Sequence, residues 1–142
     1  PCPDGEGAAR CMKLALARAG MQPSDIGYIN AHGTSTPLGD KAETLAVKSV
    51  FGGRECAPPM SSTKSATGHL MGAGGLTEVI ACIMALREGV LPPTLHLNTP
   101  DPDCDLDYVP NTARKADISA AMSNSLGFGG QNSSIIVAKY EL

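Results

Sequence analysis

The chain has 142 residues, a net charge of −3, and hydrophobic residues at 42% of its positions. That fraction, with only 18% charged residues, excludes a disordered chain, and the length suffices for one domain with a sizeable core. Acidic residues outnumber basic ones by 14 to 11 and aromatic residues make up 4%, so we expect no nucleic-acid binding. No apolar run approaches the roughly 18 residues of a membrane span, so we also expect no membrane insertion.

The first residues, Pro1–Asp4, contain no initiator Met and lead straight into a helical pattern. We therefore expect a piece of a longer protein, with a processed start as the alternative. The odd number of cysteines and the lack of CxxC spacing predict neither a zinc site nor a disulfide framework, and they favour a reducing compartment. The five are Cys2, Cys11, Cys56, Cys82 and Cys104.

Alternating helical and strand patterns predict an α/β fold with a mixed sheet. Helices are expected over 7–19, 40–50 and 70–87, and strands over 26–31, 58–62, 118–125 and 133–140. Asp40 is expected to cap the second helix, since Glu43 follows it with the spacing of a capping pattern. The third helix is apolar nearly all round, which predicts burial on most sides, and the Pro- and Asp-rich segment 91–105 predicts an extended covering loop.

Three polar or glycine-rich loops follow predicted strands, where open α/β sheets bind their ligands. His32 follows the first strand, His69 follows the second and opens the third helix, and a turn around Phe128 follows the third strand. The positive end of a helix disfavours an imidazolium, so we expect His69 to stay neutral and donate one N–H, which suits an enolate or oxyanion. A lone histidine is more often structural, and His96, in a Pro-rich stretch, is interpreted that way.

Lys64 and two carboxylates complete the polar set. An unpaired Glu78 would be costly on an apolar helix, so we predict a Lys64–Glu78 ion pair, with a surface lysine as the alternative. Glu43 is either a helix-capping residue or part of the site. No cysteine lies in a strand-to-helix turn and no serine has a GxSxG setting, so the chain offers no nucleophile and has the residues of half an active site.

The three loops carry long motifs: Asn30-Ala-His-Gly-Thr-Ser-Thr-Pro-Leu-Gly-Asp40, Ser62-Thr-Lys-Ser-Ala-Thr-Gly-His69 and Asn124-Ser-Leu-Gly-Phe-Gly-Gly130. Together they resemble the C-terminal half of β-ketoacyl-acyl carrier protein synthases, nearest to the elongating, type II bacterial enzymes. The resemblance covers essentially the whole chain in the right order and spacing. It implies a thiolase-like fold of two similar halves, each with a five-stranded sheet between helices. Residues 1–142 would be the C-terminal half-domain, incomplete at its N-terminus.

The resemblance also implies decarboxylative Claisen condensation in fatty acid elongation. An acyl group would be held on a cysteine of the N-terminal half, malonyl-carrier would lose CO₂, and the resulting enolate would attack the acyl thioester. His32 and His69 match the paired histidines that stabilise the enolate, and Lys64 matches the lysine near them. Phe128 matches the gating phenylalanine, whose backbone N–H also donates to the oxyanion.

Further residues match supporting positions of that family. Glu78 matches the partner of the lysine, and Glu43 matches another supporting carboxylate. Thr34 and Thr36 match threonines that contact the phosphopantetheine arm of the carrier. Some relatives also hold a structural monovalent cation, which here would lie near Asn30, Glu78, Ser123 and Asn124.

The resemblance implies no cofactor besides the phosphopantetheine that carries the substrates. It implies acyl carrier protein and a second copy of the full-length protein as partners, in the bacterial cytoplasm or an organelle matrix. Two alternatives stay open: a non-catalytic subunit like a chain-length factor, and a ketosynthase fragment of a polyketide synthase. Relatives of the first kind often lose a catalytic histidine, and this chain has both. Leu126 and Gln131 stand where an aromatic residue and a threonine are frequent, but neither difference removes a chemical group.

Overall fold

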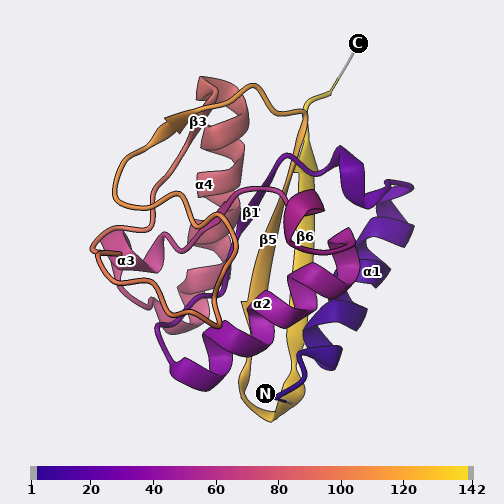
Figure 1. Ribbon diagram of the computed structural model, residues 1–142. Helices are drawn as coiled ribbons and strands as arrows, with labels where there is room; N and C mark the ends of the chain where they lie inside the picture. Colours follow the sequence, from indigo (N-terminus) through magenta and orange to yellow (C-terminus); the bar gives the residue numbers. More distant parts are fainter. Residues whose placement is uncertain (1–2, 141–142) are drawn as a thin grey trace.

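A four-stranded sheet runs through the centre of the computed structural model, which describes residues 3–140 (Figure 1). Its strands are β1 (Tyr28–Asn30), β2 (Met60–Ser61), β5 (Ala120–Leu126) and β6 (Asn132–Ala138). They lie in the order β2-β1-β5-β6, with β1 parallel to β2 and β5, and β5 antiparallel to β6. The mixed sheet is confirmed. Residues 3–140 contribute four strands to this sheet, so the five strands implied for the complete half-domain stay a prediction.

Helices cover both faces of the sheet (Figure 1). The long ones are α1 (Glu6–Ala19), α2 (Pro37–Phe51) and α4 (Gly74–Glu88). Side chains alternate along a strand, so Ile29 and Met122 pack into the core beneath α1 and α2, whereas Tyr28 and Ala121 pack with residues of α4. The sheet therefore separates two apolar cores, and its carboxyl edge lies between the helix layers.

The second helix begins earlier than the sequence predicts. α2 starts at Pro37, because proline fits the first turn of a helix, where its missing N–H costs nothing. Thr36 occupies the N-cap position, and no side chain caps the helix there. Asp40 lies inside the helix, so the prediction that it is the cap is wrong.

The predicted helix over 70–87 is broken into separate turns. The one-turn helix α3 (Lys64–Thr67) ends at Gly68, whose φ of 74° is a backbone conformation that glycine adopts readily. A 3-10 turn, Met71–Ala73, precedes α4, and Met71 has a φ of 49°. His69 therefore lies in the connection between α3 and this turn. The prediction that it opens the long helix is wrong, and the helix-dipole argument does not apply to it.

α4 is covered on one side only within residues 3–140. Cys82 and Ala85 are buried against the sheet, whereas Leu76 is 68% exposed and Ile80 is 51% exposed. The prediction that this helix is buried on most sides is therefore wrong for the described part of the chain. No helix in that part is long and apolar enough to cross a membrane.

Residues 92–113, which we call the strap, contain most of the covering loop predicted over 91–105 and lie beside α2 and α3. The strap connects two short strands, β3 (Val90–Leu91) and β4 (Arg114–Lys115), an antiparallel pair that the sequence analysis did not predict. Ion pairs from Lys41 to Asp103 and from Lys48 to Asp105 tie the strap to α2.

The described cysteines, Cys11, Cys56, Cys82 and Cys104, are all free. Cys82 is fully buried, as a small apolar residue would be. Cys2 lies outside the described residues. Between residues 3 and 140 no group of three or more His, Cys, Asp or Glu side chains could hold a metal ion.

Candidate active site

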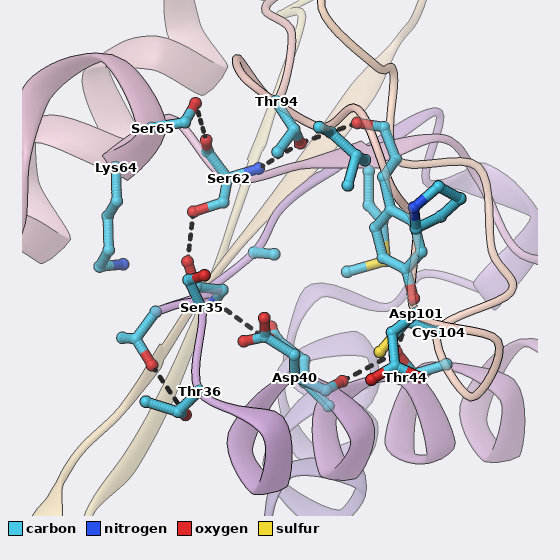
Figure 2. A pocket seen from close by; sticks show the side chains of 18 of the residues that line it. Ser35, Thr36, Asp40, Thr44, Ser62, Lys64, Ser65, Thr94, Asp101 and Cys104 are labelled. Atoms are coloured by element: carbon cyan, nitrogen blue, oxygen red, sulfur yellow. Dashed lines mark hydrogen bonds between the residues drawn. The ribbon is translucent and has the colours of Figure 1, made fainter.

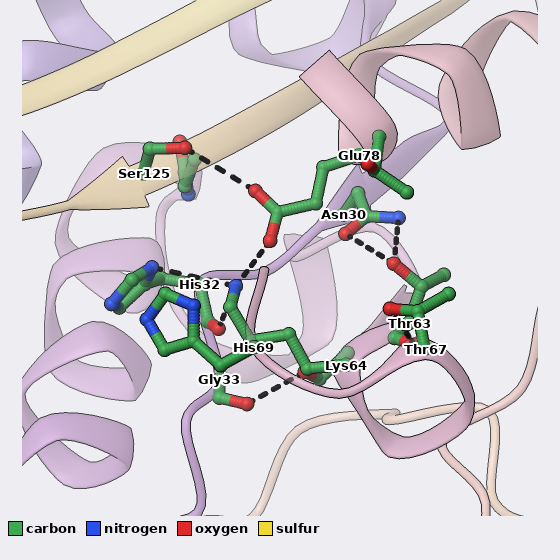
Figure 3. Close-up of polar contacts among 12 residues, drawn as sticks. Asn30, His32, Gly33, Thr63, Lys64, Thr67, His69, Glu78 and Ser125 are labelled. Carbon is green, nitrogen blue, oxygen red and sulfur yellow. Dashed lines mark hydrogen bonds and ion pairs between the residues drawn. The ribbon is translucent and has the colours of Figure 1, made fainter. Parts of the chain in front are cut away.

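His32 and His69 lie next to each other near the carboxyl ends of β1 and β2 (Figure 3). Their ring centroids are 5.6 Å apart, and the rings meet edge to face at 85°. His32 is half-buried and follows β1, while His69 is exposed and follows α3. The fold therefore brings together the two histidines that the sequence predicts to share a site.

Hydrogen bonds select one tautomer for each ring. The N–H of Met71 donates to Nδ1 of His69 over 3.2 Å. Lys64 Nζ lies 3.5 Å from Nδ1 of His32, and because an ammonium has only donors, this ring nitrogen can only accept. In each neutral ring the proton is then on Nε2, so both histidines offer an Nε2–H donor.

The surroundings of His32 keep its ring neutral. Burial, followed by the positive charge of Lys64 and the neighbouring His69, lowers the pKa of His32 to about 4. At neutral pH, His32 is therefore an uncharged hydrogen-bond donor.

The predicted ion pair between Lys64 and Glu78 is present, and only 8% and 3% of the two side chains are exposed. Lys64 Nζ also donates to the backbone oxygen of His32 over 2.6 Å (Figure 3). Ser125 donates its hydroxyl hydrogen to the second carboxylate oxygen of Glu78 over 3.2 Å. Lys64 thus connects the loop of His32 to α4, and the alternative of a surface lysine is excluded.

Glu43 holds the same loop from the other face of the sheet. Its two carboxylate oxygens accept the backbone N–H groups of His32 and Gly33, each over 3.0 Å, and Asn124 Nδ2 donates to it over 3.3 Å. Glu43 is 2% exposed, and burial raises its pKa while the N–H donors counteract that shift. The interpretation of Glu43 as a helix cap is wrong, because its oxygens accept from residues 31–36, which we call the histidine loop, and not from the first turn of α2.

A pocket of about 610 Å³ opens beside the histidines, between the loop after β1 and the strap (Figure 2). Lys64 and His69 line it, and so do Thr34 and Thr36, whose hydroxyl oxygens are 3.2 Å apart. The two threonines predicted to contact pantetheine therefore lie where a substrate arm could pass the histidines.

The strap supplies the far wall of this pocket, which the sequence analysis did not identify. Thr94 and Tyr108 line it, and so does His96, which has a left-handed φ of 63°. His96, interpreted from the sequence as a structural residue, is thus part of the pocket wall. No local motif marks these three positions, because their place in the wall depends on contacts with α2 and α3 far away in the sequence.

Phe128 does not line this pocket and is 95% exposed. It lies in a 3-10 turn, Phe128–Gly130, between β5 and β6. The structure thus leaves its side chain outside the pocket of the two histidines. Its roles as a gate and as an oxyanion donor stay predictions.

The residues expected near a monovalent cation are Asn30, Glu78, Ser123 and Asn124. The side chain of Asn30 bonds Tyr28 in the core beneath α4, and Glu78 belongs to α4 itself. The side chain of Asn124 binds Glu43 on the opposite face of the sheet. The side chain of Asn124 therefore does not face those of Asn30 and Glu78, so these three do not share one coordination shell. The cation stays a prediction, and we derive no step of a reaction from it.

The sequence of this chain is similar to one family model and to proteins of known name. A family model described as the C-terminal domain of β-ketoacyl synthases matches residues 1–98. A 3-oxoacyl-[acyl-carrier-protein] synthase 2 of Staphylococcus aureus is 51% identical over 141 residues, which are 99% of this chain and 34% of that protein. The protein of the same name from Synechocystis is 49% identical over 141 residues, with the same coverage of 99% and 34%.

One solved structure bears on partners. It shows the acyl carrier protein of a type II polyketide synthase in complex with its ketosynthase. The match has a TM-score of 0.93 and 40% identity, and it covers 98% of this chain and 34% of that chain. This chain thus spans about a third of the length of the curated relatives that it matches.

Proposed function

This chain belongs to the β-ketoacyl synthase family through its C-terminal domain, and we propose that the whole protein is a 3-oxoacyl-[acyl-carrier-protein] synthase. It would catalyse the decarboxylative Claisen condensation of an acyl thioester with malonyl-carrier in fatty acid elongation. The observation that carries this proposal is the pair of imidazole rings, 5.6 Å apart, each with an Nδ1 that accepts a hydrogen bond, beside a pocket lined by hydroxyl groups. It agrees with the 51% identity to the S. aureus synthase.

The two Nε2–H groups would stabilise an enolate. Loss of CO₂ from a malonyl thioester leaves an electron pair on the carbon next to the carbonyl, and that pair delocalises onto the thioester oxygen. Donors that are already in place stabilise the developing oxyanion without reorganising. The enolate carbon would then attack the carbonyl carbon of the cysteine-bound acyl group. A carbon–carbon bond forms, and the cysteine leaves as a thiolate.

Lys64 acts here as a positioning residue. Its ammonium is buried in contact with Glu78 and the backbone oxygen of His32, and its charge helps to lower the pKa of His32. It therefore keeps His32 in place as a neutral donor, and the proton of that donor stays on the enzyme while the enolate forms.

The rest of the machinery would lie outside this chain. We propose that residues 1–142 are the C-terminal half-domain and that the N-terminal half supplies the nucleophilic cysteine and covers the exposed face of α4. Phe128 would then donate its backbone N–H to the acyl oxyanion and gate the acyl pocket. The whole protein would act as a homodimer in the bacterial cytoplasm or an organelle matrix.

Acyl carrier protein is the proposed partner, and its phosphopantetheine is the substrate arm, so no further cofactor is required. A similar ketosynthase has been solved in complex with its carrier protein, and Thr34 and Thr36 line the pocket here. That same neighbour supports polyketide extension as the alternative function. Analysis of the products would distinguish the two, because a polyketide ketosynthase extends one chain repeatedly without reduction between rounds.

The test replaces one donor of the pair in the whole protein. His69→Ala should lower the rate of malonyl-carrier decarboxylation by about 100- to 1,000-fold, the usual effect of losing an oxyanion donor. Transfer of the acyl group to the cysteine should stay largely intact. Lys13→Ala is the control, because Lys13 is exposed on α1 and does not line the pocket. Equal losses in both partial reactions of His69→Ala would refute this division of roles.

The non-catalytic alternative has a separate test. A chain-length-factor-like subunit would lack the nucleophile, so the residue at that position of the N-terminal half, Cys or Gln, decides between the two. We also expect the 142-residue chain by itself to give no condensation. Turnover well above background by the purified chain would contradict the assignment of the nucleophile to another part of the protein.

A further inference from the structure

Ser62, directly after β2, contacts three parts of the site. Its hydroxyl donates to the backbone oxygen of Gly33 over 2.6 Å, and its backbone N–H donates to Thr94 Oγ1 of the strap over 3.1 Å. Its own carbonyl accepts the hydroxyl hydrogen of Ser65, in α3, over 2.8 Å. Figure 2 shows these contacts along the wall of the pocket. One residue therefore joins the histidine loop, the strap and the helix that carries Lys64.

Gly33 packs directly on Ser62. A Cβ atom at Gly33 would lie 2.7 Å from Cβ and 2.9 Å from Oγ of Ser62, and the φ of Gly33 is 37°. Only glycine allows this approach together with this backbone conformation. The side chain of Ser62 is thus in van der Waals contact with the residue that follows His32.

Each side of this short loop has its own partner. Glu43 accepts the N–H groups of His32 and Gly33, Lys64 donates to the oxygen of His32, and Ser62 donates to the oxygen of Gly33. The first two contacts involve charged groups, whereas the bond from Ser62 is the neutral one. It is also the contact that holds the peptide after His32 toward β2 and the strap.

We propose that Ser62 is a positioning residue for the histidine pair, because its hydroxyl fixes Gly33 and thereby keeps the ring of His32 against His69. Its effect on the reaction rate rests on the proposed function. The effect of Ser62 on the ring of His32 is independent of the proposed function and can be measured separately. Through Thr94, the same residue links the position of the strap to that of His32.

The ring of His32 itself reports on this role. The charged and titratable groups around it are Lys64 of α3, His69 of the following connection, Glu43 of α2, and Glu78 of α4 behind Lys64. Without the Ser62 hydroxyl, the loop is free to move away from β2, and the ring becomes more exposed to water. Its pKa should then rise from about 4 toward the ordinary 6.5.

The experiment compares two neighbouring serines in the whole protein. Ser62→Ala removes the bond to Gly33, and Ser62→Cys replaces it with a weak S–H donor. Ser61→Ala is the matched control. The hydroxyl of Ser61 donates to the Pro92 oxygen over 2.6 Å and bonds the Tyr28 hydroxyl over 2.7 Å in the core, but it does not contact the histidine loop.

Ser62→Ala should lower kcat for decarboxylation of malonyl-pantetheine by about three- to tenfold, the range expected for one neutral hydrogen bond, with little change in KM. Ser62→Cys should fall between the parent and Ser62→Ala. NMR titration should show a raised pKa for His32 in Ser62→Ala. Ser61→Ala should lower the melting temperature but leave kcat and the His32 titration unchanged.

Two results would overturn the proposal: an unchanged His32 titration and kcat in Ser62→Ala, or equal changes in Ser61→Ala, which would show that stability alone is responsible. If the parent protein itself lacks decarboxylation, the proposed function fails. The titration of His32 in Ser62→Ala then still decides whether Ser62 positions the ring.

Discussion

The histidine loop (residues 31–36) and the glycine turn (residues 127–131) leave the same sheet at the carboxyl ends of neighbouring strands, but they are held very differently. Glu43, Lys64 and Ser62 each bond the backbone of the histidine loop. In the glycine turn, the N–H of Gly127 donates to the oxygen of Gln131 over 2.8 Å, and the side chain of Phe128 is 95% exposed.

The difference distinguishes hydrogen-bond donors that need a fixed position from a side chain that is free to change its position. Donors that stabilise an oxyanion work best when their positions are fixed before the reaction, and buried charges tied to the backbone provide that fixation. A bulky apolar side chain on a turn with Gly129 at φ 75° has few such restraints. The two loops thus suit a fixed donor and a moving gate.

The largest expected effect comes from cutting the charged support of the histidine loop. Lys64→Ala leaves Glu78 as a buried carboxylate without its ammonium, so the free energy of unfolding should fall by about 3–5 kcal/mol in urea denaturation. Replacing both residues, in Lys64→Met/Glu78→Leu, should restore most of this stability. A loss below 1 kcal/mol in the single variant, as typical of surface pairs, would show that the pair is open to water.

Glu43→Gln should lower the free energy of unfolding by less than Lys64→Ala does, because only one of the two backbone N–H donors loses its acceptor. The amide offers an oxygen to one N–H group of His32 or Gly33 and turns an NH₂ group toward the other. An unsatisfied buried donor costs about 1–3 kcal/mol, measurable as a lower denaturation midpoint. Glu55→Gln is the control, since Glu55 is exposed and should stay within about 0.5 kcal/mol of the parent. Equal stabilities of the two variants would contradict the role of Glu43 in holding the loop.

The sequence identified the histidine loop better than it identified what holds it. The sequence predicts that His32 and His69 share a site because both follow strands of an α/β sheet, and it predicts the Lys64–Glu78 pair from the cost of an unpaired carboxylate on an apolar helix. The hydrogen bonds from Glu43 and Ser62 to the backbone of the histidine loop could not be predicted from the sequence. They join a side chain to a backbone group far away in the chain, and no residue pattern encodes such a contact.

The predicted bounds of a helix are wrong where an apolar pattern continues through a break in the backbone. The apolar run after His69 continues a helical periodicity through Gly72 and Gly74, so the break before α4 was hidden. The same apolarity predicts a helix that is buried on most sides, whereas residues 3–140 cover only one side of α4. Hydrophobicity shows that a face needs a partner and does not show which segment supplies it.

The pH dependence of stability tests the neutral state of His32. Its pKa is lowered from 6.5 to about 4, so between these values the unfolded chain binds a proton that the folded one does not. The folded state therefore has its full stability with respect to His32 above pH 6.5, and it loses stability as the pH falls toward 4 and the unfolded chain takes up the proton. Because the ring is half-exposed, we expect a loss on the order of 1 kcal/mol.

The measurement is urea denaturation from pH 7.5 to 4, about the range of the two pKa values. Burial raises the pKa of Glu43, which acts in the opposite direction. The effect is therefore taken as the difference between the parent and His32→Gln. If both proteins lose stability equally on acidification, the ring of His32 is not held neutral by its surroundings.

The smallest expected effect on stability belongs to Phe128, and it tests the other side of the comparison. The side chain is 95% exposed, so Phe128→Ala should change the free energy of unfolding by less than about 0.5 kcal/mol. In the whole protein the same variant should keep transfer of short acyl groups but weaken the order of the two half-reactions. That order requires a group that blocks the acyl pocket until the cysteine is loaded. Crystals of the free and acylated enzyme should therefore show two positions of Phe128. Superimposable positions, together with an unchanged substrate order in Phe128→Ala, would mean that the glycine turn is a plain hairpin, as fixed in function as the histidine loop.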